Sequence, residues 1–163
     1  MTPSDALFSL AEVSVAFLGF AAIASLFRQR DATDWRPDGR FWGMVGVASL
    51  ALVFSLLPLP LLFAEVAPSV TWACCSGLLS LVTAGSGVIG FVLYVRDRAA
   101  STANLPLVVL LELLIWGSAG LLLANAVGAI GRSFWPYLAG LVWLLVLAVV
   151  MFVRLLWVWL ERR

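Results

Sequence analysis

Five long apolar stretches constrain the fold of this chain more than any other feature of its sequence. They cover residues 6–27, 41–65, 70–95, 106–128 and 134–160. A helix of about 20 residues, rising about 1.5 Å per residue, crosses the hydrocarbon layer of a bilayer. Since 63% of the residues are hydrophobic and only 12% are charged, the chain cannot cover a water-soluble surface. We therefore predict an all-α integral membrane bundle of five transmembrane helices, one transmembrane domain over residues 1–163 in contact with the lipid bilayer.

Arginine placement predicts the orientation of the chain in the membrane. All ten basic residues are arginines, and eight of them fall on alternate connections or in the C-terminal tail. These eight are Arg28, Arg30, Arg36, Arg40, Arg96, Arg98, Arg162 and Arg163. The connections on the other side hold only Arg132. Because positive residues are retained on the cytoplasmic side, we predict an outside N-terminus and a cytoplasmic C-terminus in a bacterial inner membrane.

Composition excludes several classes of function. A net charge of +1 argues against nucleic-acid binding. The chain has no histidine, the commonest metal ligand, and no lysine for Schiff-base chemistry. The adjacent Cys74 and Cys75 form neither a CxxC motif nor a disulfide framework, so we expect two small buried helix residues. With no Walker, HExxH or nucleophile-elbow motif, we expect no enzymatic activity, no metal and no cofactor.

Glu12 gives the sharpest functional hypothesis, because a carboxylate roughly 10 Å inside an apolar stretch needs an explanation. Its helical face continues through Ser9, Ala16 and Gly19. Small residues in such a stripe let membrane helices pack closely. We therefore predict that Glu12 points into the bundle or into an oligomer interface, and not into lipid.

The second stretch supplies prolines at a depth similar to that of Glu12. Pro58 and Pro60 cannot donate to the carbonyls of Phe54 and Leu56, which predicts a kink or a break in the helix. A carboxylate, such carbonyls and a hydroxyl at one level would suit a cation or a proton. The candidate polar patch comprises Glu12, Phe54, Leu56, Pro58, Pro60 and Ser76. The alternative is a proline kink beside a protonated, hydrogen-bonded Glu12.

Glu112 and Arg154 form a second candidate site. Both lie roughly 12 Å from the inner boundary on successive antiparallel helices, which predicts an intramembrane ion pair. Alternatively, the pair only sets the helix register, or Arg154 extends to the headgroups. Asn125, on a different face from Glu112, is a candidate for a hydrogen bond between helices.

Small residues and aromatic residues predict the packing of the spans. A stripe in the third stretch, made of Ala73, Gly77, Ser80 and Ala84, predicts a close approach of another helix. The glycine pairs 43/46 and 117/120 predict further close contacts. Trp72 lies near the outer end of its stretch, where we expect a membrane-interface anchor.

Several short motifs, spread over most of the chain, carry a resemblance to a known group of proteins. They are Ala11-Glu12, Ala16-Phe17, Gly19-Phe20, Trp35 in the arginine-rich connection, Ser55-Leu56-Leu57-Pro58 and Phe152-Val153-Arg154-Leu155-Leu156. In these motifs the chain resembles a group of small bacterial polytopic membrane proteins to which no activity is assigned. The resemblance implies a bacterial multi-pass membrane protein and transfers no site residue.

Two functions remain open from the sequence. The first is a small channel- or transporter-like protein for a cation or a proton, with Glu12 in a polar patch beside the proline break. The alternative is a non-transporting membrane protein that binds or stabilises a membrane or cytoplasmic partner through residues 28–40. This connection contains both arginines and aspartates, together with Trp35. The many small-residue faces predict a homo-oligomer.

Overall fold

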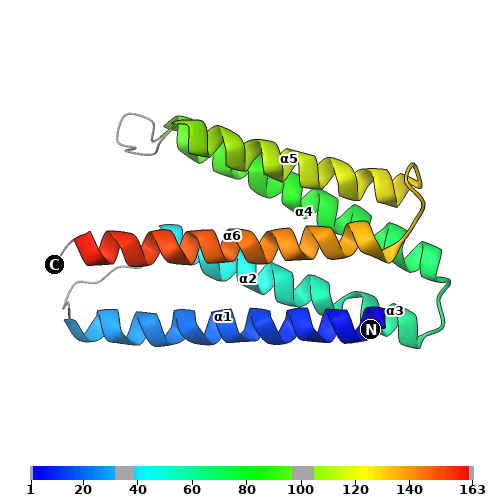
Figure 1. Cartoon of the computed structure of the whole chain (residues 1–163), viewed down its shortest axis with the longest axis horizontal. Coiled ribbons are helices and arrows are strands. Elements are labelled where there is room, and N and C mark those ends of the chain that lie inside the picture. The colour runs from blue at the N-terminus through cyan, green and yellow to red at the C-terminus, as the bar shows by residue number, and fades with distance from the viewer. Residues whose placement is uncertain (1, 32–38, 97–104, 162–163) are drawn as a thin grey trace. The chain divides into compact units, whose positions relative to one another are not determined.

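The computed structural model describes residues 2–31, 39–96 and 105–161, and each of its secondary-structure elements is an α-helix (Figure 1). Within these ranges, side chains are described except at 24, 26–31, 39, 40, 93, 105, 107 and 154–161. The helices are α1 (Pro3–Asp31), α2 (Gly39–Leu56), α3 (Pro58–Phe63), α4 (Pro68–Arg96), α5 (Leu105–Val127) and α6 (Phe134–Glu161). The all-α class predicted from the apolar stretches is confirmed.

Five segments of these helices are long and apolar enough to cross a membrane. They are Pro3–Ile23, Phe41–Phe63, Pro68–Arg96, Val108–Val127 and Phe134–Val153. Only 17% to 39% of the most apolar part of each segment is buried inside the chain. The remaining apolar surface therefore needs lipid or another apolar partner. The predicted number of five spans is confirmed by length and composition, which indicates a multi-pass membrane protein.

The second span is interrupted at the prolines. Helix α2 ends at Leu56 and α3 begins at Pro58, with Leu57 in a turn between them. The backbone N–H of Leu57 still donates to the Val53 carbonyl at 2.9 Å. Pro58 has no N–H to continue this pattern, but proline fits the first turn of a new helix, where the N–H has no helical partner. The predicted break is therefore confirmed and falls at Leu57.

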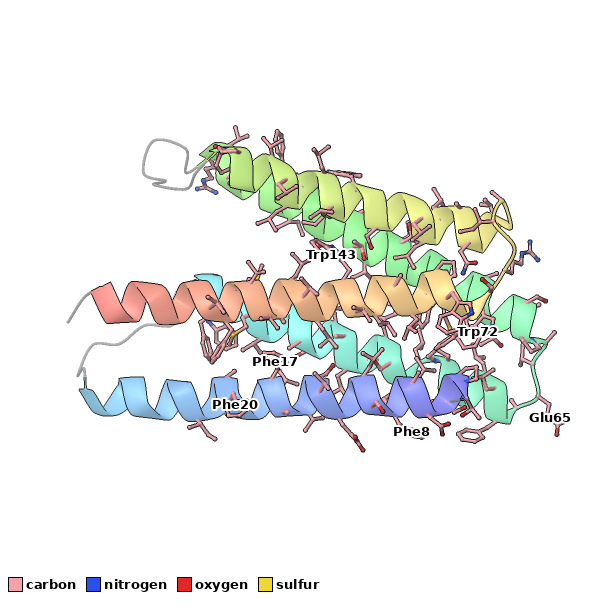
Figure 2. All side chains as sticks on the ribbon, in the orientation of Figure 1. Phe8, Phe17, Phe20, Glu65, Trp72 and Trp143 are labelled. Carbon is pink, nitrogen blue, oxygen red and sulfur yellow. The ribbon has the colours of Figure 1, made fainter. Side chains whose placement is uncertain are left out.

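Helices α3 and α5 end in the same type of C-terminal cap, the Schellman motif. After α5, Gly128 has φ 87° and donates to the Asn125 carbonyl at 3.2 Å, while Ala129 donates at 2.8 Å to the carbonyl five residues back. After α3, Glu65 takes the same place with φ 55°, in the turn that Figure 2 shows beyond that helix. A non-glycine residue in this left-handed region is uncommon, so the turn after α3 is held at some conformational cost.

Contacts within the chain divide it into two compact units, residues 1–60 with 141–163 and residues 61–140. In the first unit α1 packs along α2 (Figure 1). Its core joins Ala21, Phe41 and Met44 with Val45, Met151 and Phe152. The rings of Phe17 and Phe152 meet edge to face, with centroids 6.4 Å apart. This unit is therefore held by apolar contacts between α1, α2 and the second half of α6.

In the second unit α4 packs along α5, and small residues allow the close approach (Figure 1). The Ser80 hydroxyl donates to the Ala119 carbonyl at 2.8 Å. A Cβ placed at Gly77 would lie 3.6 Å from the Ala126 Cβ. The close approach predicted for the third stretch is therefore confirmed at Gly77 and Ser80.

Two predictions about packing are wrong. Trp72 is not an exposed interface anchor: it is 5% exposed, and its ring centroid lies 5.1 Å from that of Phe134 and 5.9 Å from that of Tyr137. Contacts between aromatic rings stabilise it in the interior of the second unit. Gly46, Gly117 and Gly120 mark no close contact, because a Cβ at any of them would meet no atom within 4 Å, whereas a Cβ at Gly43 would meet the Met151 side chain.

Candidate functional site

Glu12 lies in α1, inside the first membrane span, and its side chain is exposed. Three small residues on the same side of the helix, Ser9, Ala16 and Gly19, are exposed as well. A Cβ placed at Gly19 would meet no atom within 4 Å. The predicted small-residue face around Glu12 is therefore exposed on the surface of its own unit. We call these four residues the α1 face.

The opposite side of α1 is the buried one. Leu7, Ala11, Ser14 and Ala21, which recur at helical spacing, are at most 7% exposed. Glu12 follows Leu7 by five residues, which places it about 140° around the helix axis. Glu12 therefore points away from the core of its own unit. The oligomer interface remains as a prediction.

The proline segment does not share one surface with Glu12. Phe54 and Pro58 are buried, whereas Leu56 and Pro60 are exposed. Among the described side chains and backbone, no hydrogen bond or ion pair to the Glu12 carboxylate is found. Each side of the break at Leu57 therefore has one buried and one exposed member of the predicted patch, and Glu12 is exposed like Leu56 and Pro60.

Ser76, the last member of the predicted patch, belongs to the second unit and has a local partner. Its hydroxyl accepts a hydrogen bond from the Asn125 Nδ2 at 2.8 Å, and both residues are fully buried. Asn125 also exchanges two 3.0 Å hydrogen bonds with the backbone of Ser133. The hydrogen bond predicted between helices at Asn125 is therefore confirmed. It joins α4 to α5 and ties both to the turn before α6.

Glu112 lies on α5 against a glycine face of α4. Its Oε1 would be 3.5 Å from a Cβ placed at Gly90. The Trp116 side chain, one turn further along α5, lies beside the Glu112 carboxyl. Its indole Nε1 would lie 3.6 Å from a Cβ placed at Gly87. The carboxyl and the indole therefore occupy the space that these two glycines leave open, which we call the glycine seat.

Two predicted site components lie outside the described residues. The backbone of Arg154 belongs to α6, but its side chain is not described, so its ion pair with Glu112 stays a prediction. The predicted docking connection at 28–40 covers residues 32–38, which are outside the description, and the side chains on either side of them are outside it too.

Other polar groups show what sequence reasoning missed. Thr71 Oγ1 and Trp143 Nε1 are buried without a hydrogen-bond partner, and no sequence signal distinguishes them from ordinary helix residues.

Cys75 is buried, as predicted, but Cys74 is exposed. In the parts of the chain that the structure describes, no three histidine, cysteine or acidic side chains are grouped to hold a metal ion. The glycine seat was signalled in part by Gly87 and Gly90, which recur three residues apart in α4.

The fold and these sites indicate a class, a multi-pass α-helical membrane protein with the carboxyl groups of Asp5, Glu12 and Glu112 inside its candidate spans. No protein family, no curated protein and no solved structure matches this chain. The function is therefore argued from the residues themselves.

Proposed function

We propose that this chain is a homo-oligomeric membrane protein that conducts or exchanges a proton or another cation, with Glu12 at the contact between copies. The proposal places it in a bacterial inner membrane with the N-terminus outside, which the arginine distribution supports. The observation that carries the proposal is the exposed Glu12 carboxylate inside the first span.

An exposed carboxylate at this position favours self-association. On insertion scales, an acidic side chain at the centre of a membrane helix costs about 2.5–3.5 kcal/mol. Covering it with another helix lowers this cost, and the small Ser9, Ala16 and Gly19 leave room for one. A second copy of the chain offers the same α1 face, so symmetric association would cover both carboxylates at once.

Association of this kind also favours a bound cation or proton. Carboxylates brought close together repel each other unless they share a proton or a counter-ion. Rings of acidic side chains are a common means of cation selectivity in channels. The alternative function, a non-transporting protein that binds or stabilises a partner, would use the same exposed face for the helix of another protein.

Disulfide crosslinking tests the contact between copies. In a background of Cys74→Ala and Cys75→Ala, we expect Gly19→Cys to give a disulfide-linked dimer in native membranes. The matched control is Ala21→Cys, on the buried side of α1, where exposure is 2%; we expect it to stay monomeric. Equal crosslinking of both variants, or of neither, would contradict the α1 face as the contact.

Ion flux into liposomes tests the activity. We expect wild-type protein to dissipate a proton or cation gradient, and Glu12→Gln to reduce the flux to the level of protein-free liposomes. Glu65→Gln is the control, because this exposed carboxylate lies beyond the end of the second span, and its flux should equal that of the wild type. Background flux in all three proteins, together with crosslinking at Gly19→Cys, would overturn transport and favour the non-transporting alternative.

A further inference from the structure

The environment of Glu112 is distinct from that of Glu12, since it is built inside one hairpin. Glu112 lies within the span Val108–Val127 and is half-buried. Its Oε2 is enclosed and has no hydrogen-bond partner. The other oxygen, Oε1, lies over Gly90. One carboxyl oxygen thus rests on the glycine seat, while the other is buried without a donor.

No described cation neutralises this carboxyl. The arginines with described side chains are Arg96, at the end of α4, and Arg132, beyond α5, and neither forms an ion pair with Glu112. Tyr94, one turn beyond Gly90, is the other titratable group near this end of α4. An ionised carboxylate with a sealed oxygen in an apolar environment is costly, whereas the neutral acid is far less so.

We infer that Glu112 is a proton-binding site, a carboxyl that carries its proton at neutral pH on the glycine seat of α4. The ligand is a proton and not a metal ion, because a cation such as Ca²⁺ or Mg²⁺ takes about six or more oxygen ligands. The seat offers a glycine face and an indole N–H, which is a donor only. The inference does not depend on the proposed function, since it concerns the protonation of one residue.

Labelling with dicyclohexylcarbodiimide, an apolar reagent that traps protonated carboxyl groups as stable adducts, tests this site. The full chain in lipid nanodiscs is treated at neutral pH, and peptide mapping by mass spectrometry locates the adducts. We expect Glu112 to be labelled several-fold faster than Glu65, which is exposed in the turn after α3. Leu113→Glu places a carboxyl at an exposed neighbouring position, 66% exposed in the wild type, and reports whether the reagent reaches this depth.

Infrared spectroscopy gives a second measurement that needs no reagent. We expect a band of a protonated carboxyl in the wild type that is lost in Glu112→Gln and retained in Glu12→Gln. An unlabelled Glu112 beside a labelled Leu113→Glu, or an infrared spectrum that Glu112→Gln leaves unchanged, would overturn the inference. Either result would favour the ionised state that the predicted pair with Arg154 requires. Because flux is not measured, failure of this site and failure of the transport proposal are separate outcomes.

Discussion

The two helical hairpins of this chain use their buried polar side chains in opposite ways. In α1 and α2, Ser14 and Ser55 donate to carbonyls of their own helices, at 2.8 and 2.7 Å. In α4 and α5, Ser80 and Asn125 donate across the contact between the helices, at 2.8 Å each. A serine that bonds within its own helix adds no polar bond to the contact with the next helix, which then depends on the fit of the side chains. Hydrogen bonds between helices, in contrast, fix the register of one helix against the other.

The intramembrane carboxyl groups follow the same division. Glu12 lies on the exposed side of α1, away from the core of its own unit, whereas Glu112 is seated against α4. A hairpin with a free polar face is suited to assembly with another copy. A hairpin with internal hydrogen bonds is suited to holding one geometry. The contrast therefore favours assembly through α1 and rigidity in the α4–α5 hairpin.

Removing the Asn125 amide is expected to have the largest effect on this rigidity. Asn125→Ala deletes three hydrogen bonds, one to Ser76 and two with the Ser133 backbone. At about 0.6 kcal/mol for each bond in a membrane protein, the free energy of unfolding should fall by about 2 kcal/mol. Unfolding by SDS in mixed micelles measures the loss.

A double-mutant cycle with Ser76→Ala isolates the bond between the helices. The single variant Ser76→Ala should cost less than Asn125→Ala, and the two losses should not add, because both remove the same bond. Additive losses would show that the bond between Asn125 and Ser76 contributes nothing to stability, and the contrast between the hairpins would then lose its strongest support.

One glycine in each hairpin allows a second comparison, because replacing it by alanine should destabilise the protein in one hairpin and stabilise it in the other. A Cβ at Gly87 in α4 would lie 2.9 Å from the Ile115 Cγ2, whereas a Cβ at Gly43 in α2 would meet the Met151 Sδ at 3.5 Å, an ordinary contact. Overpacking costs about 1–3 kcal/mol, and alanine gains up to about 1 kcal/mol over glycine in a helix. We expect Gly87→Ala to destabilise the protein by about 1 kcal/mol and Gly43→Ala to stabilise it slightly. The same unfolding assay measures both, and effects of equal sign would contradict the difference in packing.

The spans and the break were predictable because they depend on local composition. An apolar run of sufficient length has few alternatives to a membrane helix, and Pro58 removes a backbone donor whatever surrounds it. Asn125 was predictable for a similar reason, since an amide in an apolar span must find a partner. In these cases the residue type determines the outcome without reference to a neighbouring helix.

The placement of the carboxyl groups could not be predicted because it depends on helix rotation. Counting residues gives the depth of Glu12 and Glu112, but not which neighbour each one faces. The stripe around Glu12 suits the interior of its own bundle and a contact between copies equally well. The glycine pair at 117/120 failed as a predictor for the same reason, since small residues permit a close contact without requiring one.

The smallest expected effect separates the two kinds of serine bond. Ser80→Ala removes a hydroxyl that donates to the Ala119 carbonyl on another helix, so the free energy of unfolding should fall by about 0.6 kcal/mol. Ser55→Ala removes a hydroxyl that donates to the Ala51 carbonyl of its own helix. That carbonyl belongs to a helix already closed by backbone bonds, and the change should be close to zero. Because both serines are buried and both substitutions delete one hydroxyl, the difference between the two losses measures the contribution of the contact between helices. Equal losses would mean that the polar bonds of the α4–α5 hairpin do no more than those of α1 and α2, and the rigidity assigned to that hairpin would then have to come from its apolar packing.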